Sequence, residues 1–151
     1  MTHPAYDLYS PAVQSTCVIF ASPHSGRAYS AAFLAQTKLN SHAIRSSEDA
    51  YMDELFADAP SHGAPLIAAR TPRAYVDFNR APEELDPALI EGVRRISPNP
   101  RVASGLGVIP RVVAGGRVIY DGKISLEQAH ARITQHWRPW HDRLQTLLDE
   151  S

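Results

Sequence analysis

The residues best suited to chemistry lie in a short polar turn that follows an apolar run. The segment from Thr16 to Arg27 reads TCVIFASPHSGR, and it predicts a buried strand that ends in a tight turn with His24 at its apex. Ligands bind at the carboxyl ends of strands in α/β proteins. A histidine displayed there suits metal coordination or proton transfer. The plainer alternative is a histidine that only hydrogen-bonds within its own loop.

Three acids form the second feature. The sequence predicts a helix from Ser46 to about Ser61, on which Asp49 and Asp53 are one turn apart and share a face. Glu48 lies closer to the apolar stripe of this helix, where a buried acid needs a partner or a metal. Acids in the first turn of a helix are also favoured by its dipole without any function. Both interpretations stay open at this point.

The third feature is the segment RAYVDFNR, which runs from Arg73 to Arg80. It predicts a strand at Ala74–Phe78, with two guanidinium groups and the Asn79 amide near its ends. Arginine binds carboxylates through a planar two-pronged fork, so this group suits an acidic small molecule. The alternative is that these are surface arginines paired with the neighbouring glutamates.

The elements that must position these features give an α/β pattern. Capping serines begin the expected helices at Ser46 and Ser125. The paired glycines Gly115 and Gly116 favour a hairpin turn, and Pro139 should kink or split the last helix. The expected elements are an N-terminal polar arm at 1–15, a short helix from Ser30 to about Leu39, a strand at Ala64–Ala69, a long loop at 82–104 with a short helix at Pro87–Val93, a hairpin at Val108–Tyr120 and a helix from Ser125 to Leu148.

Composition narrows the class of protein. The chain has 151 residues, of which 44% are hydrophobic and 21% charged, as expected for one soluble globular domain. Its 15 basic and 16 acidic side chains give no positive field for nucleic acid or anionic lipid. No apolar stretch reaches the length of a membrane span. The one cysteine, Cys17, is expected to be buried and cannot form an internal disulfide, which favours a cytoplasmic location.

Four segments together resemble a known family. They read SPHSGRAYS, RSSEDAYMDELF, GAPLIAARTPRAYVDFNR and IYDGKISLEQAHARITQHWRPWHDRLQTLL, and their order and spacing resemble those of the N-formylglutamate amidohydrolases. The resemblance covers nearly the whole chain from residue 17 onward. It implies a mixed sheet flanked by helices in the phosphorylase/hydrolase-like fold of zinc carboxypeptidases. It also implies hydrolysis of an N-formyl or N-acyl group from glutamate or a similar acidic amino acid, a reaction of histidine degradation.

The resemblance also implies a metal site. His24 would match the first ligand of Zn²⁺ or another divalent metal, and an acid of RSSEDAYMD would match the second. We favour Asp49 over Glu48, because family members keep an aspartate at that position. A small acidic N-acyl amino acid is the implied partner. By the same comparison Asn79 and Arg80 would hold its carboxylate with Ser25 also in substrate binding, and Arg73 would polarise the scissile carbonyl.

One part of the family pattern is missing from these 151 residues. Family members are longer, and their second half carries an Asp-x-His-Ser motif that supplies the third zinc ligand, with the general base nearby. We therefore expect either a fragment of a longer enzyme, which we favour, or a shortened relative with an incomplete site. A fragment would expose a sheet edge or face, which predicts self-association.

Two rival functions belong to other classes. A noncatalytic module would keep the arginine cluster and bind an acidic metabolite without metal or turnover. A metal-independent hydrolase would use Ser25 as its nucleophile, but SPHSG lacks the Gly-x-Ser-x-Gly spacing of a nucleophile elbow. We rank the second rival low.

Overall fold

A small mixed sheet forms the centre of the fold. In the computed structural model, which describes residues 1–94 and 99–151, the strands lie in the order β1-β3-β2. Strand β3 (Leu66–Ala69) pairs antiparallel with β1 (Tyr6–Tyr9) and parallel with β2 (Phe20–Ser22). The expected α/β class with a mixed sheet is confirmed. Strand β2 is shorter than the apolar run predicted, and it ends directly before the Pro23-His24 turn.

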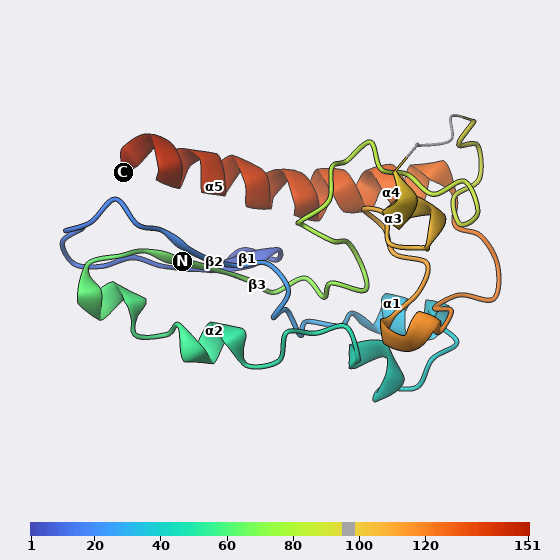
Figure 1. Ribbon diagram of the computed structural model, residues 1–151, viewed down its shortest axis with the longest axis horizontal. Coiled ribbons are helices and arrows are strands. Elements are labelled where there is room, and N and C mark those ends of the chain that lie inside the picture. Colours follow the sequence, from blue (N-terminus) through green and yellow to red (C-terminus); the bar gives the residue numbers. More distant parts are fainter. Residues whose placement is uncertain (95–98) are drawn as a thin grey trace.

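Both faces of the sheet are covered, which explains why all four residues of β3 are buried. Side chains alternate between the faces of a strand. Ile67 and Ala69 join the main core, to which Trp140 and Leu147 of the last helix also belong. Leu66 faces a smaller cluster with Ala59 and Ala64. In Figure 1 the long helix α5 runs along one side of the sheet, and the short helix α2 lies on the other.

One of the two predicted serine caps forms. The Ser125 hydroxyl accepts the Gln128 N–H at 3.1 Å, whereas no helix begins at Ser46. Ser30, which was not predicted as a cap, accepts the Phe33 N–H at 3.1 Å. Among the described residues, none of the helices combines the length and the apolar character needed to cross a bilayer. The helices are α1 (Ala31–Gln36), α2 (Met52–Leu55), α3 (Pro100–Ala103), α4 (Leu126–Arg132) and α5 (Arg138–Glu150).

Pro139 splits the C-terminal helix as predicted. A wide π-helical turn, Ile133–Trp137, separates α4 from α5, and Pro139 then lies in the first turn of α5. Proline has no N–H to donate and its ring clashes with the carbonyl four residues earlier. The wider turn accommodates both effects and lets the chain continue in the same ribbon (Figure 1).

Several expected elements are wrong. The N-terminal arm contains β1, whose alternating Tyr6 and Leu8 are buried against the core. Residues 74–78 are not a strand: Asp77 donates its N–H to the Val108 carbonyl at 2.7 Å, and the buried segment has no partner strand. Burial of apolar side chains in a loop produced the same pattern as a strand. Cys17 is exposed because it precedes β2.

The region after residue 82 is only partly as expected. No helix forms at 87–93, where turns and a bridge from Ile90 to Ile124 occur instead. Part of the expected 82–104 loop, residues 95–98, lies outside the described residues. The predicted hairpin is reduced to one antiparallel bridge, Val112 to Val118, and its turn does use positive φ angles at both Gly115 and Gly116.

Candidate metal and substrate site

The turn that carries His24 packs tightly against the segment at Arg70 and Thr71. It follows β2, and its Gly26 lies so close to the next segment that a Cβ there would be 2.1 Å from the Thr71 carbonyl oxygen. Only glycine fits such an approach. The Ser25 and Ser22 hydroxyls hydrogen-bond to each other at 2.7 Å and are buried. The His24 side chain is therefore presented from a rigid backbone.

Asp77 is the principal partner of His24. The imidazole Nε2 lies 2.7 Å from Asp77 Oδ1, and both side chains are more than nine-tenths buried. The Asn79 N–H also donates to Asp77 Oδ1 at 2.8 Å, and Arg73 Nε lies 3.4 Å from Oδ2. Sequence reasoning did not assign Asp77 a role. The available signal was an acid inside the buried run AYVDF, since buried acids need partners.

These contacts set the charge of Asp77. Burial by itself raises the pKa of this carboxyl, but the hydrogen bond and charge of His24, the Asn79 N–H and Arg73 together hold its pKa below the ordinary value. In the neutral imidazole, an ionised Asp77 at Nε2 favours the tautomer that carries its proton on Nε2 and its lone pair on Nδ1. Many metal-bound histidines are oriented in this way by a carboxylate on their other nitrogen.

Asp49 lies on the Nδ1 side of the ring. Its Oδ2 atom is 3.7 Å from His24 Nδ1, and its N–H donates to the His24 carbonyl at 2.9 Å. Two donors about 2.0–2.1 Å from a tetrahedral zinc lie roughly 3.4 Å apart. The His24–Asp49 spacing is therefore longer than a hydrogen bond and close to that of two ligands of one cation.

Glu48 is occupied elsewhere. Its carboxylate accepts the Tyr29 hydroxyl at 2.5 Å and two Arg45 N–H groups at 2.9 and 3.2 Å, and its side chain is only 4% exposed. Burial, followed by the Glu48 contact, raises the pKa of Tyr29, which keeps this phenol a donor. The expectation that Glu48 needs a partner is confirmed, and that partner is a tyrosine–arginine pair.

The helix expected from Ser46 does not form until Met52. Tyr51 has a positive φ of 65°, a strained conformation for a large side chain. The Asp49 N–H donates to the backbone carbonyl of His24, in the loop after β2, and not to a carbonyl four residues earlier as it would in a helix. Asp49 and Asp53 therefore do not share a helix face, and Asp53 pairs with Arg27 at 3.3 Å.

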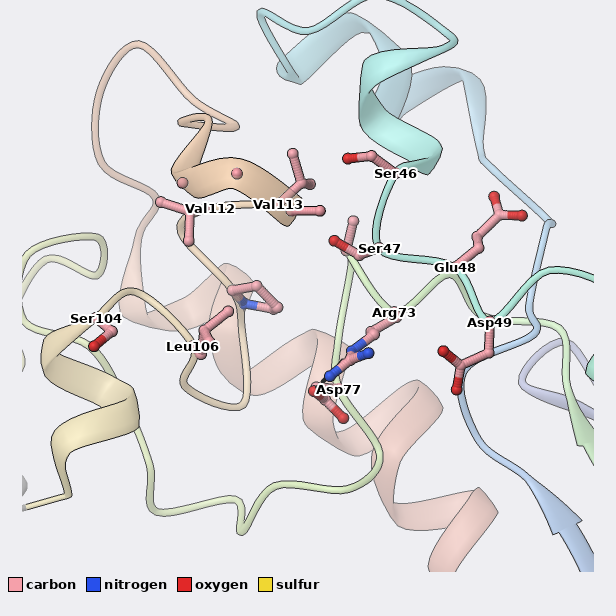
Figure 2. Close-up of a pocket in the computed structure, with 15 residues that line it drawn as sticks. Ser46, Ser47, Glu48, Asp49, Arg73, Asp77, Ser104, Leu106, Val112 and Val113 are labelled. Carbon is pink, nitrogen blue, oxygen red and sulfur yellow. Dashed lines mark hydrogen bonds and ion pairs between the residues drawn. The ribbon is translucent and has the colours of Figure 1, made fainter.

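A cavity of about 490 Å³ is lined by Asp49, Arg73 and Asp77, whereas His24 lies behind these acids and is not one of its lining residues. Figure 2 shows its two sides: Asp49 and the serines Ser46 and Ser47 on one, and an apolar segment that includes Val112 and Val113 on the other. Arg73 reaches between them next to Asp77. The cavity thus joins one acid of the potential metal pair, Asp49, to one guanidinium group and to a segment with several apolar side chains.

The structure does not bring every expected residue to this cavity. Arg80 lies 3.6 Å from Glu84, and its Nε donates to the Asn79 carbonyl. The Asn79 side chain is exposed, and neither residue lines the cavity. Ser25 borders a separate pocket of about 240 Å³. The substrate roles of these three residues stay predictions, and for Arg80 the pairing with glutamate that was the alternative is present.

The donor set fits part of a metal centre. His24 and Asp49 provide nitrogen and oxygen ligands of the kind zinc binds, and Asp77 supplies the orienting carboxylate. Catalytic zinc normally has three protein ligands and a water. Within residues 1–94 and 99–151, no group of three or more His, Cys, Asp or Glu side chains is arranged to hold a metal ion.

Comparison with known proteins identifies the family of the chain. The sequence model of the N-formylglutamate amidohydrolases matches residues 16–151, so the chain belongs to this family. A crystal structure of N-formylglutamate amidohydrolase from Ralstonia eutropha JMP134 superimposes with a TM-score of 0.89 at 31% identity, over 97% of this chain and 52% of that one. The chain thus spans about half the length of this solved relative. No curated protein sequence matches it.

Replacing Asp77 with asparagine should destabilise the protein and weaken the dependence of its free energy of unfolding on pH in the acid range. The pKa of Asp77 in the folded state lies below that of the unfolded chain, near 3.9. The carboxylate therefore stabilises the fold above about pH 4, and this contribution is lost as the pH falls through the folded-state pKa. We expect a loss of about 2–3 kcal/mol at pH 7 in urea unfolding.

Asp58→Asn is the matched control for this experiment. Asp58 also pairs with a histidine, His62 at 3.1 Å, but both side chains are exposed. This change should have little effect on unfolding at pH 7. Equal losses in Asp77→Asn and Asp58→Asn would contradict the role assigned to the buried pair.

Proposed function

We propose that this chain provides the metal pair and the oxyanion-stabilising arginine of a metal-dependent amidohydrolase that removes an N-formyl or N-acyl group from an amino acid. Family membership gives the reaction class, and N-formylglutamate is the substrate that the family name indicates. The observation that carries the proposal is the order Asp77–His24–Asp49, in which a buried carboxylate directs the histidine lone pair towards a second carboxylate.

In this proposal His24 Nδ1 and Asp49 Oδ2 hold Zn²⁺ or a similar divalent ion. When bound, such an ion lowers the pKa of a water and polarises a carbonyl. Asp77 keeps the Nε2 proton on His24, so that Nδ1 stays available. The backbone bond from Asp49 to His24 holds the two donors together, which reduces the cost of organising the pair.

Arg73 would act on the oxygen of the scissile carbonyl. As this amide is hydrolysed, a water oxygen bonds to the acyl carbon, the C–N bond breaks, and the water proton passes to the departing amine. Negative charge then develops on the carbonyl oxygen, and a fixed guanidinium beside it stabilises that charge. Of the carboxylates lining the cavity, Glu48 is held by Arg45 and Asp77 by His24, so we assign neither as the general base.

The test measures zinc binding and formate release together. Zinc is titrated into the chelator-treated chain by calorimetry, and formate is then measured with N-formylglutamate and a panel of other N-formyl amino acids. We expect saturable zinc binding, and formate release that stops with chelator and returns with zinc. Zinc binding without formate release from any substrate would contradict the catalytic proposal and favour the noncatalytic alternative.

A further inference from the structure

The segment that carries Arg73 and Asp77 is largely buried without being part of a helix or a strand. Residues 71–80 form turns, and the Asp77 N–H donates to the Val108 carbonyl at 2.7 Å. A buried backbone carbonyl in such a segment needs a hydrogen-bond donor from another part of the chain. The C-terminal helix supplies three of these donors. They are Arg132 to the Tyr75 carbonyl at 3.0 Å, Trp137 Nε1 to the Arg80 carbonyl at 2.8 Å and His141 Nε2 to the Phe78 carbonyl at 2.8 Å.

The π-helical turn Ile133–Trp137 brings these donors to one side of the helix. An α-helix turns by about 100° per residue, so Arg132 and His141, nine residues apart, would point to opposite sides of an uninterrupted helix. A π turn contains more residues per turn, which rotates every residue after it back towards the face of Arg132. Such turns are frequent at functional sites. Here the turn aims Trp137 and His141 at the segment that contains Asp77.

Trp137 and His141 hold the backbone next to Asp77. Their rings stack with centroids 3.8 Å apart, so each ring fixes the other. Phe78, whose carbonyl accepts the His141 N–H, directly follows Asp77 in the chain. The Oδ1 atom of Asp77 lies 2.7 Å from His24 Nε2. A displacement of the Phe78 backbone would therefore reach His24 through a single side chain.

We propose that Trp137 and His141 are positioning residues of the metal site. Through the two backbone carbonyls that accept their N–H groups, they fix the place of Asp77, and Asp77 in turn orients the ring of His24. This inference rests on the proposed function, in which that orientation leaves Nδ1 to the metal. The C-terminal helix thus contributes to the site, although neither Trp137 nor His141 lines the cavity.

Substitutions at His141 separate the hydrogen bond from the packing of the ring. Burial lowers the pKa of His141, so the ring is neutral at pH 7. His141→Phe keeps an aromatic ring but removes the N–H donor, and His141→Gln restores a neutral donor without the ring. Trp137→Phe removes the second donor in the same way. Leu147→Val is the control, because Leu147 is buried on the same helix and belongs to the main core.

The first measurement needs no metal. The Asn79 N–H donates to Asp77 Oδ1, so exchange of this amide with solvent reports whether the carboxylate stays in place. Exchange rates are measured by NMR relative to that of Ile67, which is fully buried in β3, so that a uniform loss of stability affects both amides alike. We expect the ratio to rise about tenfold in His141→Phe and in Trp137→Phe. It should return to its original value in His141→Gln.

The second measurement is the zinc affinity of the same variants by calorimetry. Residues that directly orient a metal ligand cost about 10–100-fold in affinity when changed, and His141 acts one contact further away. We therefore expect a loss of about fivefold to tenfold in His141→Phe. The affinity should recover in His141→Gln and stay unchanged in Leu147→Val.

The two measurements distinguish the positioning role from the proposed function. An unchanged exchange ratio in His141→Phe, an equal rise in Leu147→Val, or no recovery in His141→Gln would overturn the inference. So would an unchanged zinc affinity in His141→Phe when the original chain binds zinc. A raised exchange ratio that His141→Gln reverses, in a chain that binds no zinc, would support the positioning of Asp77 and contradict only the proposed function.

Discussion

Replacing His24 with asparagine is expected to lower zinc affinity more than about 100-fold. Residues that only orient a metal ligand cost 10–100-fold when changed, so loss of the ligand itself should cost at least as much. Asp49→Asn should have a similar effect, because its Oδ2 atom is the second donor and the neutral amide binds a cation poorly. Calorimetric or competitive zinc titration of the purified variants measures both changes.

Glu48→Gln is the control that separates the two adjacent acids. Both carboxylate oxygens of Glu48 are engaged by Arg45, and one also by Tyr29, so this residue should not contribute to the metal. We expect its zinc affinity to stay within a few fold of the unmodified chain. A larger loss in Glu48→Gln than in Asp49→Asn would reverse the assignment of the second ligand.

Arg73→Met should reduce kcat by about 100-fold to 1,000-fold for the substrate that the protein hydrolyses. Removing one donor to a developing oxyanion has effects of this size. Substrate binding should change less than kcat, because the oxygen gains most of its charge in the transition state. Steady-state kinetics with zinc present, compared at equal zinc occupancy, measures the two parameters separately.

Arg27→Met provides a closely matched comparison. Arg27 is 35% exposed and lies 3.3 Å from Asp53, while Arg73 is 32% exposed and lies 3.4 Å from Asp77. The two changes remove the same charge and a similar ion pair, but only Arg73 lines the cavity. Unaltered kcat in Arg73→Met, or equal losses in both variants, would contradict the role in oxyanion stabilisation.

The parts of the fold that the sequence predicted depend on local physics. The cap at Ser125 was predictable because a serine hydroxyl accepts an N–H two or three residues later. Gly63, with a φ of 80°, ends its helical turn, as glycine commonly does because it adopts positive φ without strain. The interruption before Pro139 follows from the proline ring alone. The zinc carboxypeptidase-like assignment of the fold stays a prediction.

The failures occurred where contacts distant in sequence outweighed local preference. A helix from Ser46 was favoured by its capping hydroxyls and acids, but burial of Glu48 against Tyr29 holds this segment as a loop. The alternation in AYVDF suggested a strand, yet Asp77 hydrogen-bonds to Val108 in a loop. In both segments the local preference was present, but a tertiary contact stabilised a different backbone conformation.

The sequence by itself determined which residues could do chemistry: the displayed His24, the adjacent acids and the RAYVDFNR segment, together with their family. Only the tertiary structure decided how they are used. It pairs His24 with Asp77, 53 residues away, and places Asp49 rather than Glu48 beside Nδ1 of the ring. It also places Arg73, but not Arg80, in the lining of the cavity. The physical reason is that these choices depend on which charged groups are buried together. Burial of that kind is set by packing between distant segments and leaves no periodic signal in the chain.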